Sequence, residues 1–395
     1  MPTVNSEILI WARESSGLDL EQAAKKLNFS TSNKSTAAEK LLAFEQGKNP
    51  SRNLLLKMSR LYRKPLLTFY LSNKPKVVDR GEDFRTLPDS FNPIDDANVN
   101  VLIRNIRARQ SIVKELLIDE DEAIELSFIG SIEASTAIKT VSNSIQKTLG
   151  FDLPTFRKYR KNEDAFRYLR TLVENSGIFV VLAGNLGSYH SNIALNIFRG
   201  YALADNVAPF IVLNDQDAKS AWSFTLLHEA VHLWLGQTGI SNTYAENKLE
   251  KFCNDVASEI LLPESEFNSF QPSFEGIEEL ALEIGKYATQ LNISSSHIAY
   301  RLFLKGVVNK AEWEWLKEHF YQKWLLFKKE IQKKNKSSDS APNPYIVKKS
   351  KLGPSLIGLA KRMTDSGALT PTKASLLLGV RPINVQKFFD TVKAA

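Results

Sequence analysis

The spacing of hydrophobic residues changes along the chain and separates helical regions from a sheet-like one. Over most of the chain up to residue 175, and again beyond residue 243, apolar residues recur every three or four positions, which predicts amphipathic helices. Between these regions, three short runs rich in β-branched and aromatic residues are separated by turn residues, which predicts a small sheet. The runs cover residues 178–182, 197–203 and 209–213. The pattern therefore predicts an α+β fold that is mostly helical.

The N-terminal helices are expected to be short and closely spaced. Helical spacing covers Ser6–Glu14, Leu20–Leu27, Thr36–Phe44 and Arg52–Leu61. Asp19 and Ser51 are suited to cap two of these helices, because their side-chain oxygens accept hydrogen bonds from free backbone N–H groups. Short helices joined by tight turns suit a helix-turn-helix bundle, which we expect over residues 1–75.

The rest of the pattern divides the chain into four further segments. We expect a linker and connecting helix at 76–130, a central domain at 131–325, a basic linker at 326–350 and a C-terminal helical tail at 351–395. Helices within them are predicted over 95–120, 132–149, 162–175, 243–262, 278–291 and 295–304. A composition rich in lysine and serine favours the linker. Thr370 followed by Pro371 favours the start of a helix in the tail.

Composition narrows the class of protein. A chain of 395 residues is too long for one compact core, and 43% hydrophobic residues is typical of a globular protein. The single cysteine, Cys253, excludes an intramolecular disulfide and fits a reducing compartment. No signal-peptide pattern or membrane-spanning stretch is visible, so we expect a cytoplasmic protein without a membrane partner. The net charge of +7 permits contact with nucleic acid without demonstrating it.

The strongest chemical signal is an H-E-x-x-H motif in the helical run that follows the last predicted strand. His228 and His232 are four residues apart and share one helical face, so both imidazoles can reach one metal ion. Glu229 lies beside them, where a carboxylate can polarise a water molecule, as a zinc peptidase requires. The alternative is an amphipathic helix with two incidental histidines. The chain has only five histidines, which makes a chance match of this kind rare.

A catalytic zinc site needs a third protein ligand and leaves its fourth position to water. The helix predicted over 243–262 carries the candidates. Glu250 and Asn254 share a face, so Glu250 can bind the metal while Asn254 hydrogen-bonds a ligand imidazole. Glu246 lies one turn earlier on that face and is the rival ligand. A surface carboxylate is the alternative role for Glu250.

Such a site would hydrolyse a peptide bond, with Glu229 carrying a proton from water to the leaving amine. The run 209–213 could pair with an extended substrate at a sheet edge or belong to the sheet core. The group that stabilises the transition state is not identifiable from the pattern. Candidates for contact with the transition state or the substrate are Tyr189, His190, His297, Tyr300 and Arg301. An isolated histidine such as His297 is more often a structural hydrogen-bonding residue.

Sequence blocks in the central domain and near the N-terminus carry a family resemblance. The central blocks are Gly200–Leu203 with Ala208–Asn214, Phe224–His232, Glu250–Pro263 and Ile293–Gly306. The N-terminal blocks are Gly17–Leu27, Phe44–Pro50 and Asp83–Arg85. Together they resemble the ImmA/IrrE zinc metallopeptidases in the form fused to an N-terminal XRE-type helix-turn-helix domain. The resemblance implies a zincin-like peptidase domain with Zn²⁺ as cofactor and Glu250 as the third zinc ligand.

The resemblance also implies a biological setting. Related proteins act in stress, mobile-element, toxin–antitoxin and phage-defence circuits, often in transcription regulation, so a repressor or toxin encoded nearby is the expected substrate or partner. The expected recognition helix, residues 35–45, presents Glu39, Lys40 and Glu45 but no arginine that could read guanine edges. DNA binding and protein contact therefore remain alternatives for the N-terminal domain, and the oligomeric state is open.

Three functional hypotheses follow. The leading one is a zinc endopeptidase of narrow specificity that regulates a partner protein. The second is a non-enzymatic DNA-binding or antitoxin-like regulator that uses the peptidase fold as an interaction platform. The third is an autoinhibited enzyme whose cleft opens when a partner binds.

Overall fold

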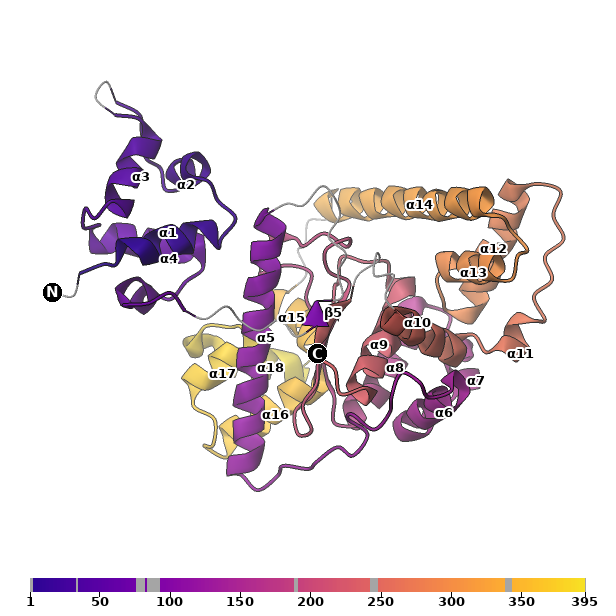
Figure 1. Ribbon diagram of the computed structural model, residues 1–395. Helices are drawn as coiled ribbons and strands as arrows, with labels where there is room; N and C mark the ends of the chain where they lie inside the picture. Colours follow the sequence, from indigo (N-terminus) through magenta and orange to yellow (C-terminus); the bar gives the residue numbers. More distant parts are fainter. Residues whose placement is uncertain are drawn as a thin grey trace.

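The computed structural model describes residues 3–32, 35–75, 82–83, 93–187, 191–241, 248–337 and 343–394. Within these ranges helices make up most of the chain, and five short strands form one sheet. Figure 1 shows the sheet enclosed by helices, with a separate group of short helices to one side. The prediction of a mostly helical α+β fold is confirmed.

The N-terminal helices form a bundle with its own core. Its elements are α1 (Ser6–Glu14), α2 (Leu20–Lys26), α3 (Ala37–Glu45), α4 (Arg52–Tyr62) and the 3-10 helix η1 (Leu66–Tyr70). The apolar faces of these helices meet in a cluster that includes Ile8, Leu41, Met58 and Phe69. The expected caps are confirmed, because the Asp19 and Ser51 side chains accept hydrogen bonds from the backbone N–H groups of Gln22 and Leu54.

A long helix and three shorter ones lead from this bundle to the sheet. They are α5 (Pro93–Asp119), α6 (Ile138–Leu149), α7 (Leu153–Lys158) and α8 (Asn162–Asn175). The helix α5 matches the predicted connecting helix closely. The segment expected to be a polar linker contributes the short strand β1 (Glu82–Asp83), which pairs in parallel with β5 (Gly239–Ser241).

The sheet is mixed, with strand order β1-β5-β3-β4-β2. The three predicted runs form β2 (Phe179–Leu182), β3 (Gly200–Leu203) and β4 (Phe210–Leu213). The strand β4 pairs in parallel with β2 and antiparallel with β3. Both hydrogen-bonding sides of β4 are therefore occupied. Of the two alternatives for this run, the open edge for an extended substrate is wrong and the sheet core is confirmed. A four-residue strand with every residue buried is typical of a sheet interior.

Helices cover both faces of the sheet, so alternate strand residues point into two different cores. Val180, Ala202 and Ile211 pack against one set of helices, which includes α6, α8, α9 and α10. Val181 and Val212 pack on the opposite face, against α5 and the C-terminal helices. This explains why the strands appear in the sequence as continuous apolar runs rather than as an alternating pattern.

The next six helices in the described part of the chain follow β4, and two of them confirm the helices predicted over 278–291 and 295–304. They are α9 (Lys219–Trp234), α10 (Lys248–Leu261), α11 (Glu264–Phe267), α12 (Ile277–Leu291), α13 (Ser295–Leu304) and α14 (Lys310–Ser337). Asn292 ends α12 in the left-handed conformation, with φ of 56°. None of the helices described in these ranges combines the length and the apolar character needed to cross a membrane.

The basic linker expected at 326–350 is mostly helical instead. The helix α14 continues to Ser337, and α15 (Pro344–Leu352) begins a few residues later. Lysine, glutamine and glutamate have good helix propensity, so a charged run can extend a helix whose first turns are fixed by buried residues such as Leu316 and Phe320. Charge and low complexity indicated exposure correctly but did not exclude a helix.

The C-terminal segment is not a tail but one wall of the sheet core. It forms α15, α16 (Pro354–Asp365), α17 (Pro371–Leu378), the 3-10 helix η3 (Pro382–Asn384) and α18 (Val385–Ala394). Leu356, Leu377 and Phe388 are almost fully buried in the core that they share with the strands. The Thr370 cap of α17 is confirmed.

A buried ion pair holds the start of this wall in place. On α8, Arg170 Nε lies 2.8 Å from Glu174 Oε1, and an Arg170 Nη1–H donates to the Ser350 carbonyl oxygen at 2.6 Å. The Glu174 carboxylate in turn accepts a hydrogen bond from the Ser355 backbone N–H at 3.1 Å. Two side chains of one helix thus fix the junction between α15 and α16.

Candidate metal centre

Three candidate ligands converge between two neighbouring helices. His228 and His232 project from α9, and their Nε2 atoms are 3.2 Å apart. The two carboxylate oxygens of Glu250, on α10, lie 3.1 Å from these nitrogens, one oxygen facing each imidazole. The i, i+4 spacing places both histidines on one face of α9, and the packing of α10 against α9 supplies the carboxylate.

The arrangement fits a tetrahedrally coordinated zinc ion. Zinc bonds of about 2.0–2.2 Å at tetrahedral angles would separate the ligand atoms by about 3.3–3.6 Å. The observed separations of 3.1 and 3.2 Å are only slightly shorter. Two imidazoles and one carboxylate are also a donor set that suits zinc and leaves one position open. The residues present therefore fit the metal that the sequence suggested.

The electrostatics of the three groups also suit a cation. Burial alone would raise the pKa of Glu250, but hydrogen bonds and charge interactions with His228 and His232 outweigh it and lower the pKa to about 2. Glu250 is therefore ionised at neutral pH. Burial lowers the pKa of His232, whereas contact with the Glu250 carboxylate overcomes burial and raises the pKa of His228. A cation between these groups would replace the protons that the imidazoles otherwise share with the carboxylate.

The residues next to the two histidines on α9 are apolar and buried. Leu226, Leu227, Ala230 and Val231 are fully buried around them on α9. The helix therefore has no solvent-exposed face over its motif turn, in contrast to an amphipathic surface helix with incidental histidines. Buried polar groups of this kind need partners, and this packing favours the metal-site interpretation of the motif over the alternative.

Glu229 lies at the point where α9 meets the sheet. Its side chain is fully buried. The ideal Cβ position on Gly200, the first residue of β3, overlaps with Glu229 Oε1 and lies 2.6 Å from its carboxyl carbon. The space occupied by the carboxylate therefore exists because β3 begins with glycine. The sequence analysis did not single out Gly200 as a functional residue, although a glycine at the start of an otherwise bulky apolar strand is a signal for such a close approach.

Neighbouring side chains surround the imidazoles. A side-chain hydrogen bond with Asn254 contributes to the raised pKa of His228, and one with Gln237 acts in the same direction on His232. The Cys253 sulfur lies 3.8 Å from His232 Nδ1. Burial raises the pKa of the Cys253 thiol well above its usual value, so it remains protonated. Asn254 thus lies beside His228, as its spacing from Glu250 suggested, and its role in orienting the imidazole stays a prediction. The nearby Gln237 was missed.

Three of the predicted contact residues have partners outside the cluster. His297 Nε2 is 2.8 Å from the Ser258 hydroxyl oxygen, and burial lowers its pKa to about 3. Arg301 donates to the same hydroxyl and pairs with Glu264. Tyr300 is partly exposed on α13, and its ring lies at a tilt to that of Trp313. Contact of these three residues with a substrate stays a prediction.

The remaining candidates are Tyr189, His190 and the rival ligand Glu246, which lie outside the described residues. Among the residues that the structure describes, His228, His232 and Glu250 are the one group of histidine, cysteine and acidic side chains placed to hold a metal ion.

Comparison with known families points to the same segment. The sequence profile of peptidase family M78, described as the IrrE N-terminal-like domain, matches residues 185–303. The match contains β3, β4, α9 and α10 and therefore the three candidate ligands and Glu229. It suggests a metallopeptidase role for this segment and leaves the N-terminal bundle and the C-terminal helices unmatched. Searches of curated proteins and of solved structures found no match.

Proposed function

We propose that the chain is a zinc-dependent endopeptidase of narrow specificity that cleaves a regulatory partner protein. The observation that carries this proposal is that the ligand atoms of His228, His232 and Glu250 lie together, next to Glu229. Their separations suit three of the four positions around a tetrahedral zinc ion. The similarity of the surrounding segment to a metallopeptidase family supports it. Repressors and toxins encoded nearby are the partner class that the sequence resemblance implies.

In this proposal three residues bind the metal and a fourth transfers the proton. His228, His232 and Glu250 hold the ion, and the chemistry that zinc supplies when bound is polarisation of a carbonyl group and acidification of water. Glu229 takes a proton from the attacking water at one carboxylate oxygen and returns it to the nitrogen of the leaving amine. The carboxylate is positioned for this by Gly200, which leaves it room, and by its place next to His228 on α9.

The site is closed in this arrangement. The exposed fraction is 5% for His228, 0% for Glu229 and His232, and 1% for Glu250. A peptide cannot reach Glu229 without a movement that opens the site. This closure favours the autoinhibited form of the enzyme hypothesis, in which binding of the partner protein opens the cleft and also confers specificity.

Metal content tests the proposal directly. We expect about one zinc per purified chain, as a three-ligand catalytic site requires, and its loss in Glu250→Ala. The matched control is Asp255→Ala, which removes a carboxylate from the same helix outside the cluster and should retain zinc. A well-folded wild-type protein that binds no zinc would contradict the proposal.

Glu229→Gln separates metal binding from catalysis. This variant should keep its zinc and lose cleavage of the partner, because the amide cannot accept the proton. The competing hypothesis is a non-enzymatic regulator, in which the closed site never opens to a substrate. In that case Glu229→Gln would retain full regulatory function in the cell.

The N-terminal bundle would supply recognition of DNA or of the partner protein. Glu45, expected to repel phosphates from the recognition helix, is instead buried and lies 2.7 Å from Arg13 Nε. Glu39 is engaged in a capping box with Thr36. Because both glutamates are engaged within the bundle, they are a weaker argument against DNA binding than the sequence suggested. The contacts are not evidence for DNA binding. Affinity that falls steeply with salt would indicate DNA, whereas affinity retained at high salt would indicate a protein partner.

A further inference from the structure

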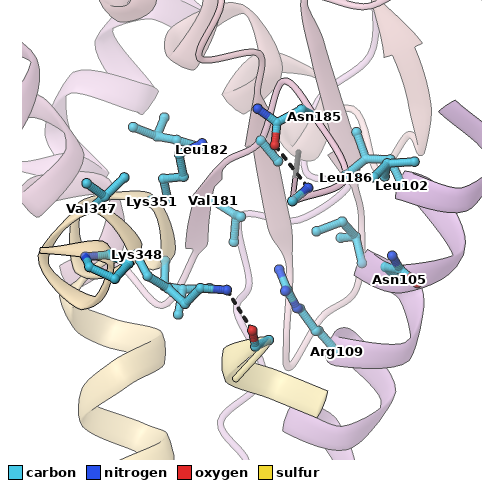
Figure 2. A pocket seen from close by; sticks show the side chains of 16 residues that line it. Leu102, Asn105, Arg109, Val181, Leu182, Asn185, Leu186, Val347, Lys348 and Lys351 are labelled. Atoms are coloured by element: carbon cyan, nitrogen blue, oxygen red, sulfur yellow. Dashed lines mark hydrogen bonds between the residues drawn. The ribbon is translucent and has the colours of Figure 1, made fainter. Parts of the chain in front are cut away.

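A cavity lies on the opposite side of the sheet from the metal cluster. Its volume is about 480 Å³, within the range of small-molecule binding sites. It opens between α5, the carboxyl end of β2, α15 and the end of α17 (Figure 2). Ligands of sheet proteins commonly bind at the carboxyl ends of parallel strands, and β2 is parallel to its neighbour β4.

Three basic side chains line this cavity. Arg109 reaches it from α5, and Lys348 and Lys351 reach it from α15 (Figure 2). Arg109 Nη2 and Lys348 Nζ converge on Gly379, where they lie 3.3 and 3.1 Å from the position that a Cβ atom would occupy. Two positive groups thus share one end of the cavity.

The cavity contains no matching negative charge. None of its sixteen lining residues is acidic. Lys351 is neutralised by Asp215, with 2.6 Å between Nζ and Oδ2. In the described part of the chain no carboxylate pairs with Arg109 or Lys348, and Lys348 donates instead to the Gly379 carbonyl oxygen at 2.7 Å. Like charges brought together in a partly buried cavity are unfavourable unless an anion joins them.

The titration behaviour of these groups agrees with this geometry. Burial lowers the pKa of Arg109 to about 10. Burial, followed by repulsion from Arg109 and Lys351, lowers the pKa of Lys348. Both groups would return toward their ordinary pKa values beside a bound anion.

The rest of the lining is apolar with two amides. Leu102, Ile106, Val181 and Leu352 form buried walls, and the Asn105 amide can offer hydrogen bonds. The Asn185 amide already accepts from the Gly187 backbone N–H and donates to Asn192. A bare inorganic anion would leave most of the volume and all of the apolar wall unused. The lining therefore suits a molecule with one anionic end and a flat or apolar body.

We propose that this cavity binds a small phosphorylated metabolite of mononucleotide size, with its phosphate between Arg109 and Lys348. The arginine fork and the lysine ammonium group donate to the phosphate oxygens. The base or other apolar body lies against the walls formed by α5 and β2, and Asn105 hydrogen-bonds its polar edge. This site is separate from the metal cluster and does not depend on the proposed peptidase activity.

Calorimetric titration of the full-length protein tests the site. The probes are adenosine, guanosine, cytidine and uridine 5′-monophosphates, with inorganic phosphate and the uncharged nucleosides as comparisons. We expect at least one monophosphate to bind more tightly than both inorganic phosphate and its nucleoside. Arg109→Gln and Lys348→Gln should each weaken that binding at least about tenfold. Arg381→Gln removes an exposed charge next to the same end of α17 and should leave binding unchanged.

The melting temperature of each variant without ligand establishes that it is folded, and Arg109→Lys, which keeps the charge, provides a second folded variant with intermediate affinity. Binding of inorganic phosphate as tightly as any nucleotide would overturn the assignment of a mononucleotide-sized ligand. The absence of binding by every probe, or binding unaffected by Arg109→Gln and Lys348→Gln, would overturn the site itself.

Discussion

The backbone of Gly200 on β3 directly abuts the carboxylate of Glu229 on α9. A Cβ atom at Gly200 would overlap with Glu229 Oε1 and lie 2.8 Å from its Cγ. No such contact arises from sequence proximity, since the two residues belong to different layers of the fold. The close approach fixes how deeply the motif helix can pack against the sheet and where the proposed proton carrier is held.

Gly200→Ala should therefore displace Glu229 while leaving the three metal ligands in place. We expect a loss of stability of about 1–3 kcal/mol from overpacking, retention of zinc, and a fall in cleavage rate on the order of 100-fold, because small misplacements of a catalytic group are costly. Zinc content, chemical denaturation and cleavage of the partner protein measure the three effects.

The matched control is Gly285→Ala on α12, where an added Cβ meets no atom within 4 Å. That change should stabilise the helix slightly, since alanine has the higher helix propensity. A Gly200→Ala variant with wild-type stability would show that β3 and α9 do not pack as closely as described.

Asn254→Ala should weaken zinc binding without removing it. The Asn254 side chain lies close enough to His228 to contribute to its raised pKa, and loss of an orienting partner typically costs 10–100-fold in metal affinity. Competition with a chromophoric chelator at fixed pH measures the affinity. Asp255→Ala, on the neighbouring position of α10, should leave it unchanged. Equal affinity of wild type and Asn254→Ala would assign Asn254 a purely structural role.

His297 should make the protein sensitive to acid. Burial, with smaller contributions from Arg301 and Arg157, lowers its pKa to about 3 in the folded state, against about 6.5 in the unfolded chain. Between these values the unfolded state binds the additional proton, so stability decreases as pH falls below about 6.5. The loss between pH 6.5 and pH 5 is up to about 2 kcal/mol.

Denaturation of wild type and His297→Gln across this pH range tests the assignment. The glutamine variant should be less stable at pH 7.5, because its hydrogen bond to Ser258 is altered, but its stability should depend less on pH. Parallel pH profiles for the two proteins would rule out His297 as the source of the acid sensitivity.

Glu174→Gln should destabilise the junction between α15 and α16. The substitution leaves the buried guanidinium of Arg170 without its counter-charge, and breaking a buried pair in this way costs about 3–5 kcal/mol. Urea denaturation measures the cost. The comparison variant is Asp365→Asn, whose partner Lys361 lies four residues away on the exposed face of α16; it should cost less than about 0.5 kcal/mol. Similar losses in both variants would contradict the structural role of the buried pair.

Much of the local structure was predictable from the sequence. The strands at 179–182, 200–203 and 210–213, the helices α12 and α13, and the caps Asp19, Ser51 and Thr370 agree with the expectations. These features depend on interactions within a few residues: the periodicity of one apolar face, the rotamer preferences of β-branched residues and hydrogen bonds at helix ends.

Two expectations failed for a common reason. The basic linker is helical to Ser337, and the supposed tail covers one face of the sheet. Composition reports how well a segment is solvated, but not whether a preceding helix continues through it or where a following helix packs. The apolar faces of α16 to α18 were visible in the sequence, whereas the sheet surface that they bury lies some 150 or more residues earlier in the chain.

The sequence by itself determined the candidate chemistry: the H-E-x-x-H spacing aligns His228 and His232 on any helix, because four residues make about one helical turn. Tertiary structure alone brought the Glu250 carboxylate to 3.1 Å from both imidazoles, placed Gly200 against Glu229 and moved His297 and Arg301 into structural contacts. It also gathered Arg109 and Lys348 from distant helices into one cavity. Contacts of this kind depend on which helix faces meet and at what depth, and that is decided by packing of the whole core rather than by local sequence.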